Sequence, residues 1–173
     1  MTSQIKYNTK RCFTLLELYL YLIDGEEIDY ESFKDMYGLS KNEYLLMINT
    51  IDEMTSDLHL ECRLQHNKEK IITKETEYFS FKYKFEPASD HEFDASNLTD
   101  EKKIKYSAVI VYLRLKNKQK VTYDNLSKFF PKFTRDIFSV MITKFKDIFG
   151  EEIYKNEIQS YILDETEWKD ATI

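Results

Sequence analysis

Two stretches of the chain share one pattern of apolar residues, and this repeat limits the possible folds more than any other feature. The first stretch spans residues 16–51 and the second spans residues 109–145. They align at an offset of 93 residues through two predicted helices, and one additional residue in the next turn places Thr134 opposite Ser40 at an offset of 94. Amphipathic helices can be aligned by chance, but a shared tyrosine and a shared hydroxyl residue before the third helix favour a true repeat.

Apolar residues at helical spacing predict three helices in each copy. In the first copy these helices are expected over residues 12–23, over residues 30–37 and from Ser40 onward. Ser40 and Thr134 carry hydroxyl groups that can cap the first turn of a helix, so each predicts the start of a third helix. The composition agrees, because the chain has only three Gly and two Pro and is rich in residues that favour helices.

Alternation of apolar and polar residues after the third helix predicts a β hairpin in each copy. In the first copy the strands are expected in LHLECRL (residues 58–64) and YFSFKYKF (residues 78–85), with QHNKEK (residues 65–70) as the turn. In the second copy two short strands are expected on either side of Lys155 and Asn156, which would form the hairpin tip. Three helices followed by a hairpin is the order of a winged helix-turn-helix.

The sequence therefore predicts a mainly α fold with small β hairpins, in the α+β class, made of two tandem winged helix-turn-helix units. Acidic and small polar residues in EPASDHEFDASNLTD indicate a linker between the units. The expected boundaries are 1–86 for an acidic first unit, 87–100 for the linker, 101–164 for a basic second unit and 165–173 for an acidic tail.

Charged residues are segregated along the chain. The formal net charge of the whole chain is −6, which argues against a nucleic-acid-binding protein. Between Lys102 and Lys146, however, twelve basic residues stand against two acidic ones, so this block has a charge of +10 and the rest of the chain −16. Such a block can attract a polyanion even in an acidic protein, because exposed charges are largely screened beyond about 8–10 Å at physiological salt.

The third predicted helix of the second copy has a polar and basic face opposite its apolar face. This face, the residues before it and the hairpin tip supply the candidate DNA-binding residues, which are Thr134, Arg135, Ser139, Thr143, Lys144, Lys128, Lys132, Lys155 and Asn156. The hydroxyl and guanidinium groups can contact phosphates or base edges, and the lysines can contact phosphates. The same cations would also suit an exposed helix without a ligand, and the basic loop RLKNKQKV would also suit RNA or an acidic protein.

Residues 15–54, LLELYLYLIDGEEIDYESFKDMYGLSKNEYLLMINTIDEM, resemble the N-terminal winged helix-turn-helix of bacterial DeoR-like regulators, especially those with WYL domains. The likeness rests on an apolar first helix, an acidic loop, the FKDMYGLS helix and turn, and the helix that follows. It implies a DNA-binding fold and a role in transcription regulation. Such regulators follow the turn serine with Arg and Thr, whereas this chain has Lys41, Asn42 and Glu43. This departure predicts a first unit that reads DNA poorly.

Leu45 and Leu46 lie beside the apolar stripe of the same predicted helix and are the candidate partner-binding residues. Packing of both leucines against the hairpin is an equal alternative. A two-fold homodimer built on the first unit would present two basic second units to a pseudo-palindromic DNA site. The plan of two winged helices is also similar to that of plasmid replication initiators and of the acidic accessory subunit of bacterial condensin.

The sequence predicts no catalytic residue, metal ligand, cofactor or small-molecule substrate. The three histidines have no nucleophile partner or ligand spacing, and the three glycines form no phosphate-binding loop. Cys12 and Cys62 lie far apart and are expected to be reduced thiols in a cytoplasmic protein. The apolar run near the N-terminus is short and contains Glu17, so no membrane span or membrane partner is expected.

The resulting hypothesis is a small cytoplasmic transcription regulator of bacterial or phage origin, not an enzyme. Its second unit would contact double-stranded DNA and its first unit would mediate association. The alternative is a protein-interaction or scaffolding module that has the winged-helix fold and does not bind DNA. Convergence of the basic residues on one face would favour the first hypothesis, and their scatter over opposite sides would favour the second.

Overall fold

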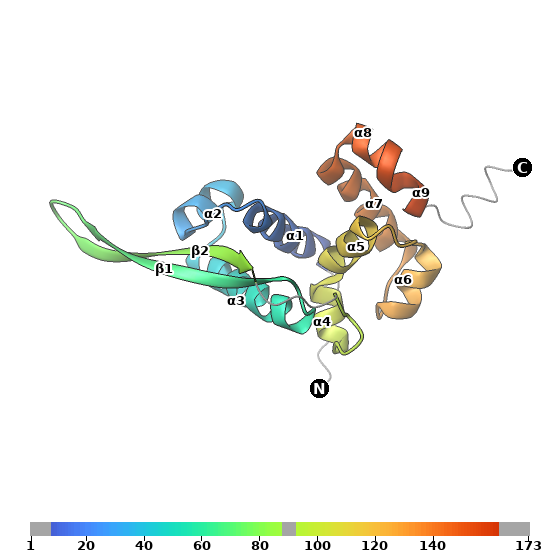
Figure 1. Ribbon diagram of the computed structural model, residues 1–173, viewed down its shortest axis with the longest axis horizontal. Helices are drawn as coiled ribbons and strands as arrows, with labels where there is room; N and C mark the ends of the chain where they lie inside the picture. Colours follow the sequence, from blue (N-terminus) through green and yellow to red (C-terminus); the bar gives the residue numbers. More distant parts are fainter. Residues whose placement is uncertain (1–7, 88–92, 163–173) are drawn as a thin grey trace, which may run out of the picture. The chain divides into compact units, whose positions relative to one another are not determined.

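The computed structural model describes residues 8–87 and 93–162 (Figure 1). The chain forms two compact units: one comprises Glu17–Asn97, and the other comprises the residues before Glu17 together with those from Leu98 onward. We call them the hairpin unit and the helical unit. Helix α1, Thr9–Ile23, contributes its beginning to the helical unit and the rest to the hairpin unit. The predicted acidic tail, residues 165–173, lies outside the described residues.

In its described part, the hairpin unit contains the end of α1 followed by two helices and two strands, which are α2 (Tyr30–Tyr37), α3 (Lys41–Asp57), β1 (Cys62–Ile72) and β2 (Glu77–Pro87). The Asp29 carboxylate caps α2 by accepting a hydrogen bond from the backbone N–H of Ser32 at 2.8 Å. Gly38 ends α2 in the left-handed backbone region with φ 67°. Ser40 caps α3 by accepting from the backbone N–H of Glu43 at 3.2 Å, so the predicted start of this helix is confirmed.

Strands β1 and β2 pair in antiparallel register along their whole length. The turn between them is closed by the Thr73 N–H, which donates to the Thr76 carbonyl at 2.8 Å. The prediction that residues 65–70 form the turn is wrong, because they lie inside β1. The predicted first strand also begins too early, since Leu58 and Leu60 are buried at the end of α3. Figure 1 shows the hairpin extending past α2 and α3, so these polar residues pair where no core covers them.

The base of the hairpin is anchored to the helices. Ile28, between α1 and α2, forms an antiparallel bridge with Tyr83 of β2, with N–H to carbonyl distances of 2.9 and 2.8 Å. The Tyr83 ring lies 6.3 Å from the ring of Tyr44 in α3, and the Phe85 ring lies 5.7 Å from the ring of Tyr19 in α1. The bridge adds a short third strand position to the edge of the two-stranded sheet.

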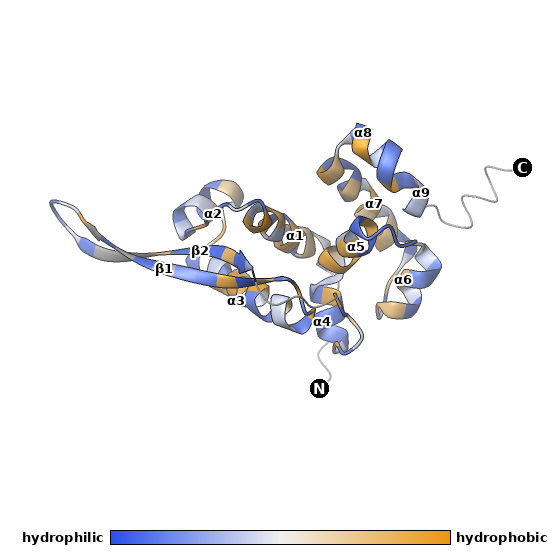
Figure 2. Cartoon of the chain, in the orientation of Figure 1, coloured by the Kyte–Doolittle hydropathy of each residue, from blue (hydrophilic) through white to orange (hydrophobic). Residues whose placement is uncertain are grey.

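Among its described residues, the helical unit contains the beginning of α1 followed by six helices and a π-helical segment, which are α4 (Asp100–Lys105), α5 (Ser107–Lys116), α6 (Tyr123–Phe129), α7 (Arg135–Phe149), α8 (Glu151–Ile153), η1 (Tyr154–Ile158) and α9 (Gln159–Ile162). Thr134 caps α7 by accepting from the backbone N–H of Ile137 at 3.2 Å, as predicted. The Phe13 ring of α1 packs 5.1 Å from the ring of Phe145 in α7. Figure 2 colours α1 and α5 largely as apolar, in agreement with the buried side chains of both helices.

The second predicted hairpin is wrong, because residues 151–162 are helical. Tyr154, Ile158 and Ile162 are buried at intervals of four residues, and this interval places side chains on one face of a helix. Lys155 and Asn156 therefore lie on η1 and not at a hairpin tip. The described residues are mostly helical with one two-stranded antiparallel sheet, which confirms the mainly α, α+β prediction at this level.

Aligned positions of the two units adopt the same local structure. The helix caps Asp29 and Thr122 are related by the offset of 93 residues, and each accepts a hydrogen bond from a backbone N–H of the helix that follows it. Lys132 is aligned with Gly38 at the offset of 94 residues, and both have a left-handed backbone, with φ 56° and 67°. The two units thus share their aligned helices, the caps of those helices and a left-handed residue in the turn before the third helix.

The units differ in what covers the aligned position between their first and second shared helices. Ile28 of the hairpin unit pairs with Tyr83 of the hairpin, whereas the aligned Val121 donates its backbone N–H to the Tyr161 carbonyl of α9 at 2.6 Å. In the helical unit this position is therefore covered by the final helices, whereas in the hairpin unit it is covered by the hairpin.

Candidate nucleic-acid interface

The exposed face of α7 has the polar groups that the sequence predicts there. Arg135, Ser139 and Thr143 are all exposed. The Thr143 hydroxyl donates to the Ser139 carbonyl at 3.1 Å, which leaves its oxygen lone pairs for a ligand. The Thr134 hydroxyl oxygen is engaged as the cap of α7. Thr134 thus stabilises the helix that presents the other three residues.

The same face has no excess of positive charge. Its exposed cations Arg135 and Lys146 are matched by the exposed carboxylates of Asp136 and Asp147. Val140 adds an apolar side chain that is 44% exposed. Because phosphate binding depends on net positive charge, the outer face of α7 is a weak phosphate-binding surface by itself.

Three of the predicted lysines have partners within the helical unit. Lys128 and Lys155 form ion pairs with Asp124 and Glu151, with Nζ to carboxylate distances of 3.2 and 3.8 Å. Exposed pairs of this kind contribute about 0.2–1 kcal/mol, so either lysine can exchange its carboxylate for a phosphate. Lys144 is half-buried, and its Nζ lies 5.7 Å from the centre of the Phe13 ring.

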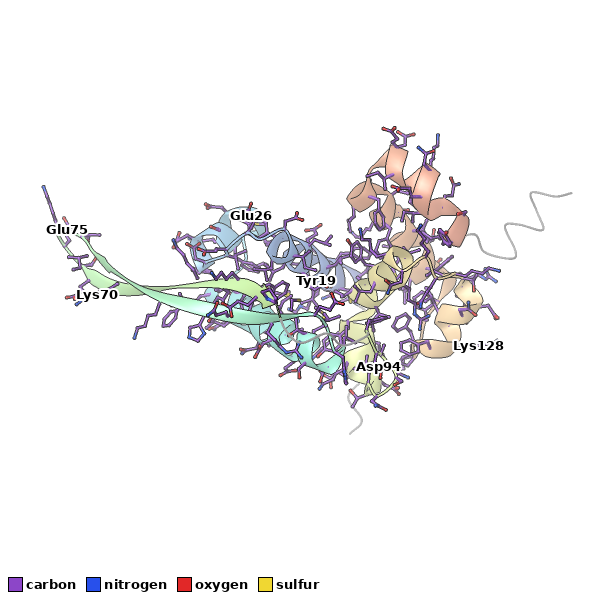
Figure 3. The ribbon with its side chains drawn as sticks, viewed as in Figure 1. Tyr19, Glu26, Lys70, Glu75, Asp94 and Lys128 are labelled. Atoms are coloured by element: carbon purple, nitrogen blue, oxygen red, sulfur yellow. The ribbon has the colours of Figure 1, made fainter. Side chains whose placement is uncertain are left out.

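Figure 3 shows the Lys128 side chain pointing away from α6, where a ligand can reach it. Asn156, the remaining residue of the predicted hairpin tip, is exposed on η1. Lys144, in contrast, covers the Phe13 ring and belongs to the packing between α7 and α1. The predicted set therefore divides into exposed residues and one packing residue.

The positive charge of the helical unit is concentrated before α7. Residues 100–133 contain nine basic and three acidic residues, which gives a net charge of +6. Residues 134–162 contain four basic and five acidic residues, which gives −1. Lys116 is exposed at the end of α5, Lys118 and Lys120 are exposed in the loop between α5 and α6, and Lys132 is exposed in the turn before α7. The strongest cationic segment of the helical unit is thus residues 100–133. It comprises α4, α5, α6, the α5–α6 loop and the turn before α7.

Four rings of α6 and the turn after it form a continuous aromatic row. Successive ring centres are 4.9 Å apart from Phe129 to Phe130, 5.8 Å from Phe130 to Phe133 and 6.0 Å from Phe133 to Tyr123. At one end of the row, the guanidinium carbon of Arg135 lies 4.3 Å from the Tyr123 ring centre. The row links the start of α7 to the far end of α6.

Two cations from other helices meet at the opposite end of the aromatic row. The Lys103 Nζ of α4 lies 4.7 Å from the centre of the Phe129 ring, and the guanidinium carbon of Arg114 in α5 lies 5.0 Å from it. All three residues are half-buried. Burial lowers the pKa of the Arg114 guanidinium, which remains protonated at neutral pH. We call this cluster the Phe129 site.

Sequence reasoning missed the Phe129 site. Lys103, Arg114 and Phe129 come from three different helices, so no local spacing relates them. The basic block that contains the two cations was visible in the sequence, but the convergence of those cations on one ring depends on tertiary packing.

The exposed face of α3 differs from the cationic segment. Leu45 and Leu46, the predicted partner-binding residues, are 41% and 54% exposed. Asp52 and Glu53 are exposed on the same helix, where Lys41 is the exposed cation. This face is apolar and acidic, which suits a protein surface better than a phosphate backbone.

No protein-family model, curated protein or solved structure matches the chain. Within residues 8–87 and 93–162, no group of three or more His, Cys, Asp or Glu residues is arranged to hold a metal ion. The helices in these ranges are all too short or too polar to span a membrane. Cys12 is buried and Cys62 is half-buried, and both are free thiols.

Proposed function

We propose that this chain is a small DNA-binding transcription regulator whose helical unit contacts double-stranded DNA and whose hairpin unit mediates association. The observation behind the proposal is the arrangement of α6, the turn and α7, a helix-turn-helix order in which Lys132 and Arg135 lie on either side of the cap residue Thr134. The segment before it has a net charge of +6. Cations in this position suit contacts to the phosphate backbone.

The element order of the hairpin unit supports a winged helix-turn-helix fold for that unit. Three helices precede the hairpin, and the bridge between Ile28 and Tyr83 joins the segment between the first two helices to the second strand. The resemblance of residues 15–54 to DeoR-like regulators points the same way. For the helical unit we propose a helix-turn-helix without a hairpin wing, because helices follow α7.

The charge distribution favours binding through phosphates over reading of base edges. Ser139 and Thr143 can reach bases from α7, but the charged residues of that face cancel. The larger supply of cations lies before α7, at Lys128, Lys132 and the α5–α6 loop. We therefore expect strong dependence of affinity on salt and modest discrimination between DNA sequences.

The second candidate is a protein-interaction or scaffolding module, which the exposed Leu45 and Leu46 favour. Under this alternative the cations of the helical unit would serve solubility or bind an acidic protein. It predicts that double-stranded DNA is not bound, even at low salt.

Fluorescence anisotropy with a labelled random duplex, measured across a salt series, tests the proposal. We expect wild-type binding whose logarithm falls linearly with the logarithm of the salt concentration, at about −0.9 per phosphate contact. Arg135→Gln should weaken binding, and the matched variant Asp136→Asn should strengthen it, because the two residues have opposite charges on one exposed turn. Absence of binding at low salt would overturn the proposal and favour the protein-interaction module.

A further inference from the structure

We infer that Lys103 and Arg114 form a phosphate-binding site around Phe129, away from the α7 face on which helix-turn-helix recognition would depend. The inference rests on the proposed function and deepens it, because it names a second place where the DNA backbone is held. Its ligand is a phosphate group, and the sugar–phosphate backbone of a duplex is the source that the surrounding charge favours.

The two cations of the Phe129 site contact one ring, and neither has a compensating carboxylate among the described residues. Each is within about 5 Å of one ring centre, at 4.7 Å for Lys103 and 5.0 Å for Arg114. In the part of the chain that the structure describes, neither forms an ion pair, whereas Lys105 of the same helix pairs with Glu101 at 3.3 Å. Both cations are half-buried, and removing an unpaired charge from water is costly. A bound anion would balance that charge.

The Arg114 guanidinium also has donors available for an anion. Its side chain makes no hydrogen bond to any described residue, and none of its nitrogens is a buried atom without a partner. The stem and one side of the group are covered, since Arg114 is half-buried against Phe129. A guanidinium that is stacked on a ring and has free N–H groups is suited to bidentate contact with phosphate oxygens.

Cation–π contact alone is the competing explanation. A cation over an aromatic ring contributes about 0.5–1 kcal/mol at exposed sites, and one cation would supply that contact to Phe129. Such a contact leaves the charge of both half-buried cations without an ion pair among the described residues. A bound anion would account for that charge as well as for the contact with the ring.

The two ends of the aromatic row suit an extended polyanion. Arg135 lies over Tyr123 at the start of α6, and the Phe129 site lies at its end. Six residue steps at 1.5 Å separate these ends by about 9 Å along the helix. Duplex DNA presents one phosphate every 3.4 Å of axis along each strand, so it can reach both ends, whereas one free phosphate can occupy only one.

The test measures duplex binding across a salt series for the double variant Lys103→Gln/Arg114→Gln. Lys105→Gln is the matched control. Lys105 lies on the same helix but pairs with Glu101. We expect the double variant to bind about tenfold or more weakly, with a salt slope reduced by about one to two units, and the control to change little. Arg114→Lys should lose part of this affinity, because it keeps the charge and removes the planar fork.

Thermal unfolding of each variant separates loss of the site from loss of the fold. If the double variant melts like the wild type and has the affinity and salt slope of the Lys105→Gln control, the inference is overturned while the proposed function stands. If Arg135→Gln weakens binding and the double variant does not, DNA is held at the α7 end alone.

A second arm uses pyrophosphate and the Nε–Hε signal of Arg114 in ¹H–¹⁵N NMR spectra. If the wild type binds no duplex, the proposed function fails, and this arm then decides the site. A saturable shift of the Arg114 signal that is absent in Lys103→Gln would support a site for a free phosphate compound in place of a DNA backbone. Absence of any shift together with absence of duplex binding would overturn the inference.

Discussion

Lys132 has the backbone conformation of Gly38, the residue with which it is aligned in the other unit. The φ angles are 56° and 67°, and each residue lies two positions before the cap of the helix that follows. Glycine adopts this left-handed region without steric cost, whereas a residue with a Cβ pays about 1–2 kcal/mol. The helical unit therefore has a lysine where the turn itself favours glycine. The proposed DNA contact would give this lysine a function that glycine cannot provide.

Lys132→Gly should separate the stability of the turn from its charge. Removing the Cβ relieves the left-handed strain, so we expect the free energy of unfolding to rise or stay level, within about 1 kcal/mol. Removing the charge should weaken duplex binding and reduce the salt slope by about one unit. Urea unfolding and anisotropy on the same preparation measure both quantities.

Lys118→Gly is the matched control for that prediction, because Lys118 also has φ 56° and lies in the exposed α5–α6 loop. Both variants should relieve strain to a similar extent. A marked loss of stability in Lys132→Gly would contradict the strain argument, and unchanged duplex affinity would remove Lys132 from the proposed interface.

The helix caps of the aligned third helices should have similar energetic weight. Thr134→Ala and Ser40→Ala each remove a hydroxyl that accepts a backbone N–H at 3.2 Å, so each should lower the free energy of unfolding by about 0.5–2 kcal/mol. Thr134→Ser retains the hydroxyl and serves as the control. Urea denaturation measures the effect, and equal stability of Thr134→Ala and Thr134→Ser would argue against the cap.

Local signals in the sequence were sufficient for the three helices that the two units share. Ser40 and Thr134 begin α3 and α7 because a side-chain hydroxyl at that place satisfies an otherwise unpaired N–H, and this chemistry is readable from adjacent residues. Element boundaries that depend on short-range hydrogen bonds are thus accessible to sequence reasoning.

The strands and the Phe129 site depended on information that neighbouring residues do not contain. The apolar residues in 151–162 predicted two short strands. In the structure, Tyr154, Ile158 and Ile162 are instead buried at a helical interval. In the first hairpin, residues 65–70 are polar, and their backbone pairs with β2 beyond the hydrophobic core. No alternation of apolar and polar residues therefore predicted a strand there. Lys103 and Arg114 reach the Phe129 ring only through the packing of three helices.

The hairpin unit should lose stability at alkaline pH through Tyr44. Burial, followed by the nearby Tyr83 and Asp29, raises the pKa of Tyr44 above its ordinary value, and its hydroxyl donates to the Ile28 carbonyl at 3.5 Å. Because the pKa of Tyr44 is raised in the folded state, the protonated hydroxyl contributes fully to the free energy of unfolding below the ordinary pKa of about 10. This stabilisation is lost as the pH rises above that value. Urea unfolding from pH 9 to pH 11.5 should therefore show a steeper loss for the wild type than for Tyr44→Phe.

Tyr30→Phe supplies a comparison for Tyr44→Phe, since it removes a hydroxyl from a ring that packs 5.7 Å from Tyr44. We expect it to retain most of the wild-type pH dependence. If Tyr44→Phe loses stability with pH as steeply as the wild type does, the buried hydroxyl is not the group responsible.

Association through the hairpin unit should depend on Leu46. This side chain is 54% exposed on α3, and neighbouring Leu45 is 41% exposed, so a self-associating surface there would bury both. Leu46→Glu places a carboxylate where apolar contact would form, and it should shift the chain toward monomers by at least tenfold in dissociation constant, since burying an unpaired charge costs several kcal/mol. Val140→Glu, at a residue 44% exposed on α7, is the matched control in the helical unit. Sedimentation equilibrium measures the change. If both variants retain the wild-type association state, α3 does not form the interface, whereas dissociation by Val140→Glu alone would move the association surface to the helical unit.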